Sequence, residues 1–263
     1  MSKTTPAVDF TNTEIAFDHQ TDRQLLRTAW LFRMMSNNLL VDFGSKATLF
    51  ALRVGLPIKT VIKKTIFQHF CGGATLPECQ VSAAALAKYG VDTVLDYGAE
   101  GKEDEASFDL TVYELQRSLE FAREKPYVPI VTGKITGLME FALLEKLASK
   151  QPLTHQENPA YQKAMTRLDS LCITAYDTLV SLFIDGEESW IQDAIDEMTT
   201  EMMERYNKER ITVYNTFQLY RHDRLAYLKA SYERAQEKGY ILGAKLVRGA
   251  YMEKERARAQ RLG

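Results

Sequence analysis

Apolar residues recur every three or four positions through residues 1–90, a spacing that places side chains on one face of an α-helix. The pattern predicts three helices, over residues 22–40, 58–70 and 77–90. Pro77 suits the first turn of the third helix and Gly90 its end, because glycine readily adopts the left-handed conformation found there. The pattern between the first two helices is expected to be interrupted at Gly44, Gly55 and Pro57. Residues 1–90 are therefore predicted to form a helical arm.

The pattern changes after residue 90, where short and nearly continuous apolar runs alternate with amphipathic segments. Such runs are typical of strands that are buried on both faces. Five strands are predicted, within residues 91–98, 127–135, 177–188, 211–220 and 243–251. The segments between them carry helical stripes, such as Phe108, Val112, Leu115, Leu119 and Ala122, or Ile191, Ala194, Ile195, Met198 and Met202. Strands that alternate with helices predict right-handed crossovers and a parallel sheet, which is an α/β fold.

Chain length, net charge and cysteine count limit the classes of protein to which this sequence can belong. By length alone the 263 residues could form one complete α/β barrel, which needs ~250 residues, or two smaller domains. A net charge of −2 gives no general argument for a nucleic-acid partner, and three cysteines are too few for a disulfide framework. Asp9, Glu14 and Asp18 argue against a secretory signal or a transit peptide. Because no apolar run approaches the ~20 residues of a membrane span, we expect a cytoplasmic protein.

Polar or ionisable residues follow each of the five predicted strands. The carboxyl ends of parallel strands meet at one edge of a sheet, and the loops there build the ligand sites of such folds. The residues are Asp96 and Glu100; Lys134; Asp185, Glu187 and Glu188; Gln218, Tyr220, Arg221 and His222; and Lys245, Arg248 and Tyr251. The sequence therefore predicts a site for a polar ligand at this edge.

Lys134 lies between the apolar residues Val131 and Ile135, where an ammonium group is unfavourable unless it is paired. One interpretation is a carboxylate-binding site in which Asp185, on the next strand, orients Lys134. A second is a Schiff-base lysine of the class I aldolase kind. A third is structural, with the side chain extending from the mouth of a barrel into water. The residues alone leave all three open.

The carboxylates of Asp185, Glu187 and Glu188 could bind a hard metal ion or cap the helix that follows them. Three of the four histidines lie away from this edge, so no metal site is expected. The chain has no GxGxxG and no P-loop motif, which argues against a Rossmann or Walker nucleotide site. The small residues Gly249 and Ala250 would allow close approach of a planar or phosphorylated cofactor.

Six segments together resemble the FAD-dependent proline dehydrogenases. They are TLPEC (75–79), LDYGAEG (95–101), TGKITGL (132–138), FIDGEES (183–189), NTFQLYRHD (215–223) and KLVRGAYMEKER (245–256). The last is the most specific, and all six follow the order found in the family. Residues 1–90 are also similar to the helical arm that precedes the barrel in single-function members. The resemblance implies a (βα)8 TIM-type barrel, of which residues 91–263 supply about five strands.

The resemblance further implies an activity. Members of the family hold FAD noncovalently and oxidise L-proline to 1-pyrroline-5-carboxylate by hydride transfer to the flavin N5. A membrane quinone then accepts the electrons. By this resemblance we expect peripheral contact with the inner face of a membrane and no nucleic-acid partner.

The resemblance assigns substrate roles to five residues. Lys134 matches the lysine that pairs with the substrate carboxylate, and Asp185 matches the aspartate that holds this lysine in place. Asp96 and Tyr251 match residues that line the proline site. Glu100 matches the acid of a gating ion pair.

The resemblance assigns cofactor roles to four further residues. Gln218 matches a glutamine that hydrogen-bonds the flavin. Lys245 matches a position that places positive charge near flavin N5, where the reduced ring needs it. Val247 and Gly249 match residues that offer backbone groups to the cofactor.

The chain departs from the family pattern at its end. The arginine that would pair with Glu100, three further strands and a final helix with two adjacent arginines are expected after Gly263. These 263 residues by themselves are therefore expected to be inactive and poorly stable, because a sheet of five strands leaves parallel edges unpaired. Two other classes stay open, namely an aldolase-type barrel that uses Lys134 and a barrel fragment without catalytic function.

Overall fold

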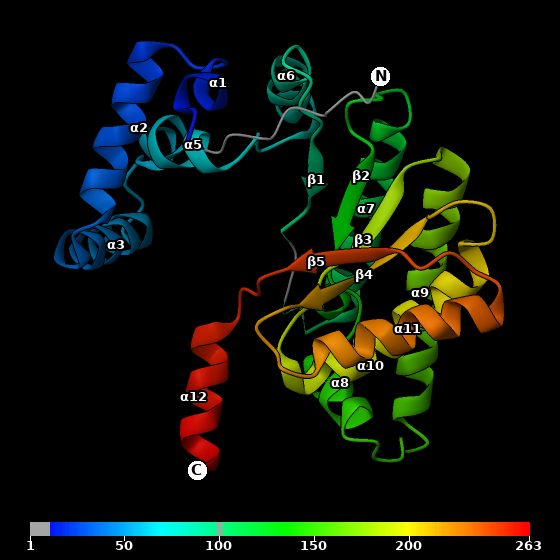
Figure 1. Ribbon diagram of the computed structural model, residues 1–263. Helices are drawn as coiled ribbons and strands as arrows, with labels where there is room; N and C mark the ends of the chain where they lie inside the picture. Colours follow the sequence, from blue (N-terminus) through cyan, green and yellow to red (C-terminus); the bar gives the residue numbers. More distant parts are fainter. Residues whose placement is uncertain (1–10, 99–100, 102) are drawn as a thin grey trace, which may run out of the picture. The chain divides into compact units, whose positions relative to one another are not determined.

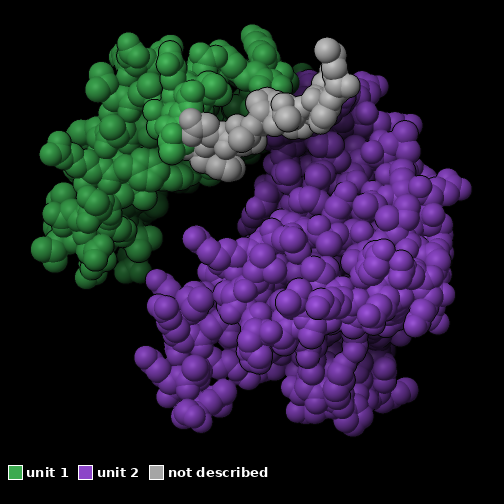
Figure 2. Space-filling model, in the orientation of Figure 1, with its two compact units in different colours: residues 1–91 green, residues 92–263 purple. Residues whose placement is uncertain are grey.

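The chain divides into two compact units, Met1–Val91 and Asp92–Gly263 (Figure 2). A computed structural model describes residues 11–98, 101 and 103–263. The described residues of the first unit form helices, and those of the second form a parallel sheet with helices (Figure 1). Glu100, which the sequence predicts as a gating acid, lies outside the described residues.

The helices of the first unit follow one another closely along the chain. In order they are α1 (Thr13–Phe17), α2 (Asp22–Met35), α3 (Asn38–Arg53), α4 (Lys59–Ile62), the π-helical segment η1 (Lys63–Phe67), α5 (Gln68–Phe70) and α6 (Leu76–Ala87). The predicted helix over 58–70 is thus one continuous helical stretch with a wider central turn. At α6 the Thr75 side chain accepts the Glu78 N–H, and Pro77 occupies the first turn as predicted.

The prediction of one helix over residues 22–40 is wrong at its C-terminal end. α2 ends at Met35, and the side chain of Asn37 accepts the backbone N–H groups of Leu39 at 3.1 Å and Leu40 at 3.3 Å. Asparagine in this role starts a new helix, because it satisfies N–H groups that have no partner within the helix. Gly44, expected to interrupt the helical pattern, consequently lies inside α3.

The second unit is built on one sheet of five parallel strands in the order β1-β2-β3-β4-β5. The strands are β1 (Val94–Asp96), β2 (Ile130–Gly133), β3 (Ser181–Ile184), β4 (Val213–Gln218) and β5 (Ala244–Val247). Each lies within a run predicted from the sequence, so the predicted α/β fold is confirmed. Parallel strands in consecutive order are the arrangement of successive strands in a (βα)8 barrel.

Helices connect the strands and carry the core. They are α7 (Glu105–Ala122), the 3-10 turn η2 (Ile135–Gly137), α8 (Phe141–Ala148), α9 (Glu157–Thr178), α10 (Ser189–Tyr206), α11 (Arg224–Lys238) and α12 (Met252–Leu262). The α7 stripe is buried except for the half-buried Val112, and all five stripe residues of α10 are buried. α7 packs on β2 and α10 on β4, strands that hold the fully buried Val131 and Phe217. Within residues 11–98, 101 and 103–263, no helix combines the length and the apolar character needed to span a bilayer.

Candidate active site

The register of the sheet brings the predicted site residues to one edge. Asp96 pairs in register with Thr132, Gly133 with Ile184, and Gln218 with Val247, so the carboxyl ends of neighbouring strands align. The Asp185 N–H donates to the Gly133 carbonyl at 3.0 Å and continues the ladder beyond β3. Lys134, Asp185 and Gln218 therefore stand at the ends of β2, β3 and β4, on the same edge.

Asp185 forms an ion pair with Lys245 of β5. The Lys245 ammonium also lies 5.1 Å from the centre of the Phe183 ring. Both charged side chains are mostly removed from solvent, and in the sheet β4 lies between their strands. Lys245 is thus fixed beside β4, which carries Gln218. The predicted contact between Asp185 and Lys134 stays a prediction.

Lys134 is half-buried between the buried residues Gly133 and Ile135. Its carbonyl accepts the Gly137 N–H at 3.1 Å, which closes η2 directly after β2. The positive charge of Lys134 lowers the pKa of Glu187, so the two side chains interact electrostatically. Lys134 therefore places a positive charge at the end of β2, on the short turn η2 and within electrostatic range of Glu187.

Glu187 is the most unusual carboxyl group at this edge, and the sequence did not indicate its role. It is buried, and its carboxylate accepts the Thr136 backbone N–H at 3.1 Å and the Thr136 hydroxyl. Burial raises the pKa of Glu187 to about 7, although the Thr136 hydrogen bonds act in the opposite direction. This group therefore joins the loop after β3 to the lysine-bearing turn after β2. Only the contact with Thr136, 51 residues away, reveals this.

Gln218 is buried and holds a hydrogen-bond acceptor that has no partner among the described residues. Its Nε2 donates to the Glu187 carbonyl at 2.8 Å, whereas its Oε1 is buried and unpaired. A Cβ on Gly186 would lie 3.0 Å from Gln218 Cγ, so glycine at that position leaves room for the amide. A buried acceptor without a partner is unfavourable, and a bound ligand that donates a hydrogen bond would satisfy it.

Gly249 is packed directly against the Tyr220 ring. It has a φ of +121°, and a Cβ there would lie 1.6 Å from Tyr220 Cδ1, so no other residue fits. Burial and the nearby Glu255 carboxylate raise the pKa of Tyr220 to about 12, which keeps its hydroxyl protonated. The sequence predicts Tyr220 at this edge without assigning it a role, and the structure shows that its ring supports the loop after β5.

The remaining predicted residues lie on the same edge with less definite contacts. Asp96 is exposed at the end of β1, and Tyr251 is half-buried, with the Lys254 ammonium 5.1 Å from its ring centre. The Val247 carbonyl accepts the Leu219 N–H at 2.8 Å, so it already takes part in the strand ladder. These positions fit the predicted roles and stay predictions.

The idea that the carboxylates after β3 cap α10 is wrong. Glu187 bonds Thr136, and Glu188 forms an ion pair with Lys254 of α12. The first amide of α10, that of Ser189, donates instead to Glu255 at 2.7 Å, and the Ser189 hydroxyl donates to the same carboxylate at 2.7 Å. An acid from α12 thus occupies the N-terminus of α10 and links the loops after β3 and β5.

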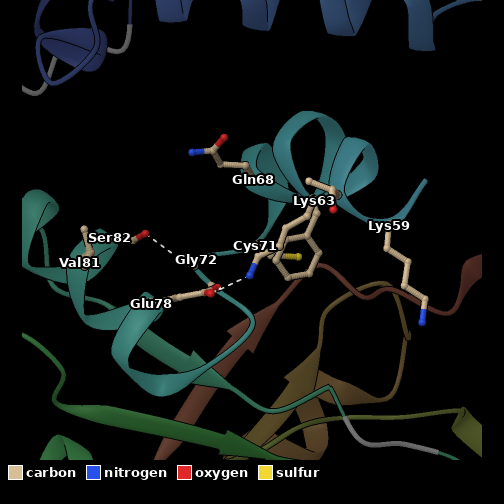
Figure 3. Close-up of a pocket in the computed structure, with 11 residues that line it drawn as sticks. Lys59, Lys63, Gln68, Cys71, Gly72, Glu78, Val81 and Ser82 are labelled. Carbon is tan, nitrogen blue, oxygen red and sulfur yellow. Dashed lines mark hydrogen bonds and ion pairs between the residues drawn. The ribbon is translucent and has the colours of Figure 1, made fainter. Parts of the chain in front are cut away.

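A hollow of about 600 Å³ in the first unit carries none of the predicted site residues (Figure 3). Its lining includes Lys63, Cys71, Glu78 and Ser82. The Lys63 ammonium lies 2.6 Å from the Glu78 carboxylate, and the Ser82 hydroxyl donates to the Gly72 carbonyl at 2.6 Å. These polar groups bond to one another, and the hollow holds none of the predicted site residues. We therefore take the strand-end edge of the second unit as the candidate site.

Comparison with known proteins places this edge in a family. A family model described as proline dehydrogenase matches residues 79–263, which include all five strands. The chain belongs to the proline dehydrogenase family. The match begins within α6 and contains every residue predicted for the site.

Individual relatives agree with this assignment. The carbapenem antibiotics biosynthesis protein CarD of Pectobacterium carotovorum subsp. carotovorum is 33% identical over 187 residues, which are 71% of this chain and 50% of that protein. The mitochondrial proline dehydrogenase 1 of Dictyostelium discoideum is 28% identical over 280 residues, covering 91% of this chain and 49% of that protein. The chain thus spans about half the length of these relatives.

A solved structure supports the fold. Proline utilization A (PutA) from Bdellovibrio bacteriovorus, inactivated by N-propargylglycine, aligns with a TM-score of 0.64 at 18% sequence identity. The alignment covers 78% of this chain and 22% of that chain. At this identity the likeness concerns the arrangement of strands and helices.

Proposed function

We propose that the protein oxidises L-proline to 1-pyrroline-5-carboxylate, with a noncovalently bound FAD as the hydride acceptor and a membrane quinone as the final electron acceptor. Membership of the proline dehydrogenase family supports an oxidoreductase that acts on proline. The finer parts of this proposal rest on the strand-end edge of the second unit.

The residues of this edge fit a flavin. The observation that carries the proposal is the buried, unpaired Oε1 of Gln218, which can accept a hydrogen bond from an N–H of the flavin ring. Asp185 holds the Lys245 cation beside β4, where positive charge would favour an anionic reduced ring. FAD, when bound, supplies the two-electron chemistry that amino-acid side chains lack. Gln218 and Lys245 would hold the ring, and Val247 and Gly249 would border it.

The substrate side of the proposal rests on Lys134. Its ammonium stands at the end of β2, on a turn that Glu187 holds in place through Thr136. A charged donor in this position would bind the proline carboxylate with a charge-assisted hydrogen bond. Tyr251 would pack on the proline ring, Asp96 would line the proline site, and Glu100 would supply the acid of a gating ion pair. None of these side chains needs to take up a hydride; their work is binding and orientation.

The proposal places the protein in the cytoplasm, with peripheral contact at the inner face of a membrane, where a quinone is accessible. We expect no turnover from the 263 residues by themselves, so proline oxidation is measured on the longer chain that adds the three strands and the final helix expected after Gly263. β1 and β5 each have one neighbour in the sheet, so each leaves an edge of parallel backbone groups unpaired.

The visible absorption spectrum of the purified protein tests the proposal. A flavin band that L-proline bleaches would support it, and Gln218→Leu should lower the amount of flavin that co-purifies. An aldolase-type barrel would instead form a covalent adduct at Lys134 when a carbonyl substrate is reduced with borohydride, and mass spectrometry would detect it. A barrel fragment without catalytic function would give neither result.

A further inference from the structure

The helices of the first unit leave large apolar side chains in contact with solvent. Among its described residues only Ala83 is buried. On α3, Leu39, Phe43 and Phe50 are 81%, 74% and 66% exposed. Their spacing of four and seven residues places them on one face of the helix. This exposed apolar stripe indicates a surface that binds something outside the unit.

α2 carries a second stripe of the same kind. Leu26 and Trp30, four residues apart, are 73% and 62% exposed, and Met34 continues the same face. The two helices contact one another, so both stripes belong to one helix pair.

Basic residues border both stripes. Lys46 and Arg53 lie seven residues apart on the face of α3 that carries Phe43 and Phe50, and the α2 stripe is bordered by Arg23, Arg27 and Arg33. α2 and α3 hold five Lys and Arg against Asp22 and Asp42, a net charge of +3, although the whole chain has −2. The apolar stripes therefore lie within a basic segment of a mildly acidic protein.

We propose that α2 and α3 form a docking surface for a membrane that carries anionic lipid. Exposed aromatic and aliphatic residues flanked by Lys and Arg are the pattern of helices that lie in the membrane interface. Tryptophan prefers the level of the headgroups, and long basic side chains reach out to the phosphates while their stems stay apolar. The contact is one of helices lying on the bilayer, since no described helix could span it.

Charge argues against a second copy as the occupant. Two copies meeting through this surface would bring two surfaces of +3 together, whereas an anionic leaflet attracts each of them. The inference gives a location to the membrane contact in the proposed function. It is drawn from the first unit alone and does not depend on the flavin or on proline.

The test is sedimentation of the protein with vesicles of phosphatidylcholine, with and without phosphatidylglycerol, in the absence of proline. We expect binding only to the anionic vesicles, weakened by salt. The variant that combines Phe50→Ser with Arg53→Gln should bind roughly tenfold more weakly, because it removes one apolar contact and one charge. The variant that combines Arg23→Gln with Leu26→Ser makes the same kind of change on α2 and should weaken vesicle binding by a similar factor. The matched control, Leu225→Ser with Lys229→Gln, changes the exposed surface of α11 and should bind like the unaltered protein.

Three outcomes would overturn the inference: no binding to anionic vesicles, equal losses in the variants and the control, or a change of oligomeric state in the α2 and α3 variants on gel filtration. The last would identify this surface as an interface between copies. Circular dichroism checks that the variants keep their helices. Proline oxidation with a soluble dye as acceptor should be unchanged in these variants, so failure of the docking surface and failure of the proposed function give different results.

Discussion

The Asp185 carboxylate at the end of β3 is ion-paired with Lys245 of β5, and the intervening strand, β4, carries Gln218. The two partners therefore come from the strands on either side of β4, which carries the buried acceptor that the proposed flavin site uses. Both side chains are shielded from most of the solvent. If one partner is removed, water cannot easily solvate the charge that remains. The geometry of this edge depends on keeping the two charges together.

Breaking this pair should destabilise the protein, with a measurable coupling. In a double-mutant cycle with Asp185→Asn and Lys245→Met, followed by urea unfolding, we expect a coupling free energy of about 1 kcal/mol. Lys245→Arg should preserve most of it, because a cation remains. Strictly additive single and double variants would show that the pair contributes nothing to stability.

Glu187 should make stability depend on pH. Its folded pKa of about 7 lies above the ordinary value of 4.5, so the folded state favours the protonated form. The stabilising contribution is complete below pH 4.5 and is lost as the pH rises through 7. Over that interval the free energy of unfolding should fall by up to about 3 kcal/mol relative to Glu187→Gln.

Denaturant unfolding at a series of pH values measures this difference. Glu124→Gln, which alters an exposed carboxylate of the same unit, is the control and should follow the unaltered protein at every pH. A Glu187→Gln variant with the same pH profile as the unaltered protein would contradict the account.

Glu255 should protect the first backbone amide of α10 from hydrogen exchange. Its carboxylate accepts both the amide and the hydroxyl of Ser189, so Glu255→Ala leaves that amide without a partner. Loss of a helix cap costs about 1 kcal/mol. Hydrogen exchange at Ser189 should therefore be roughly fivefold faster in Glu255→Ala, and unchanged in Glu253→Ala, which alters an exposed acid of the same helix turn. Equal rates of hydrogen exchange at Ser189 in both variants would show that Glu255 does not have the assigned role.

Lys134 should act on substrate binding. Lys134→Ala removes a charge-assisted contact worth ~1.5–3 kcal/mol, so KM for proline should rise by about one to two orders of magnitude. Lys229→Ala, on the exposed surface of α11, is the control. Steady-state kinetics measure both variants, and unchanged proline kinetics in Lys134→Ala would show that the assigned role is wrong.

The sequence predicts the strands of this protein well, and the physical reason is burial. A strand covered on both faces needs an uninterrupted apolar run, and each of the five runs contains its strand. Burial on both faces holds for β2 and β4, but the expectation is wrong for the outer strands: Val94 and Asp96 of β1 are exposed, and no residue of β5 is fully buried. The ends of those strands then follow from parallel geometry, which explains why Lys134, Asp185 and Gln218 were identified from the order of residues.

What the sequence did not reveal are the contacts between distant loops. Glu187 and Thr136 are 51 residues apart, and Glu255 and Ser189 are 66 apart, so no local spacing signals either pair. Glu188 followed by a helix is a reasonable cap by local rules, yet Lys254 takes its charge. The helix break at Met35 did have a local signal, because Asn37 is a favourable capping residue.

The central claim is that this edge of the sheet oxidises proline with a bound flavin. The most direct measurement is the visible spectrum of the purified longer chain, which includes the strands expected after Gly263, before and after anaerobic addition of L-proline. The account predicts a flavin band that proline bleaches, with more proline needed in Lys134→Ala. A protein without a flavin band, or with a band that proline leaves unchanged, would contradict it.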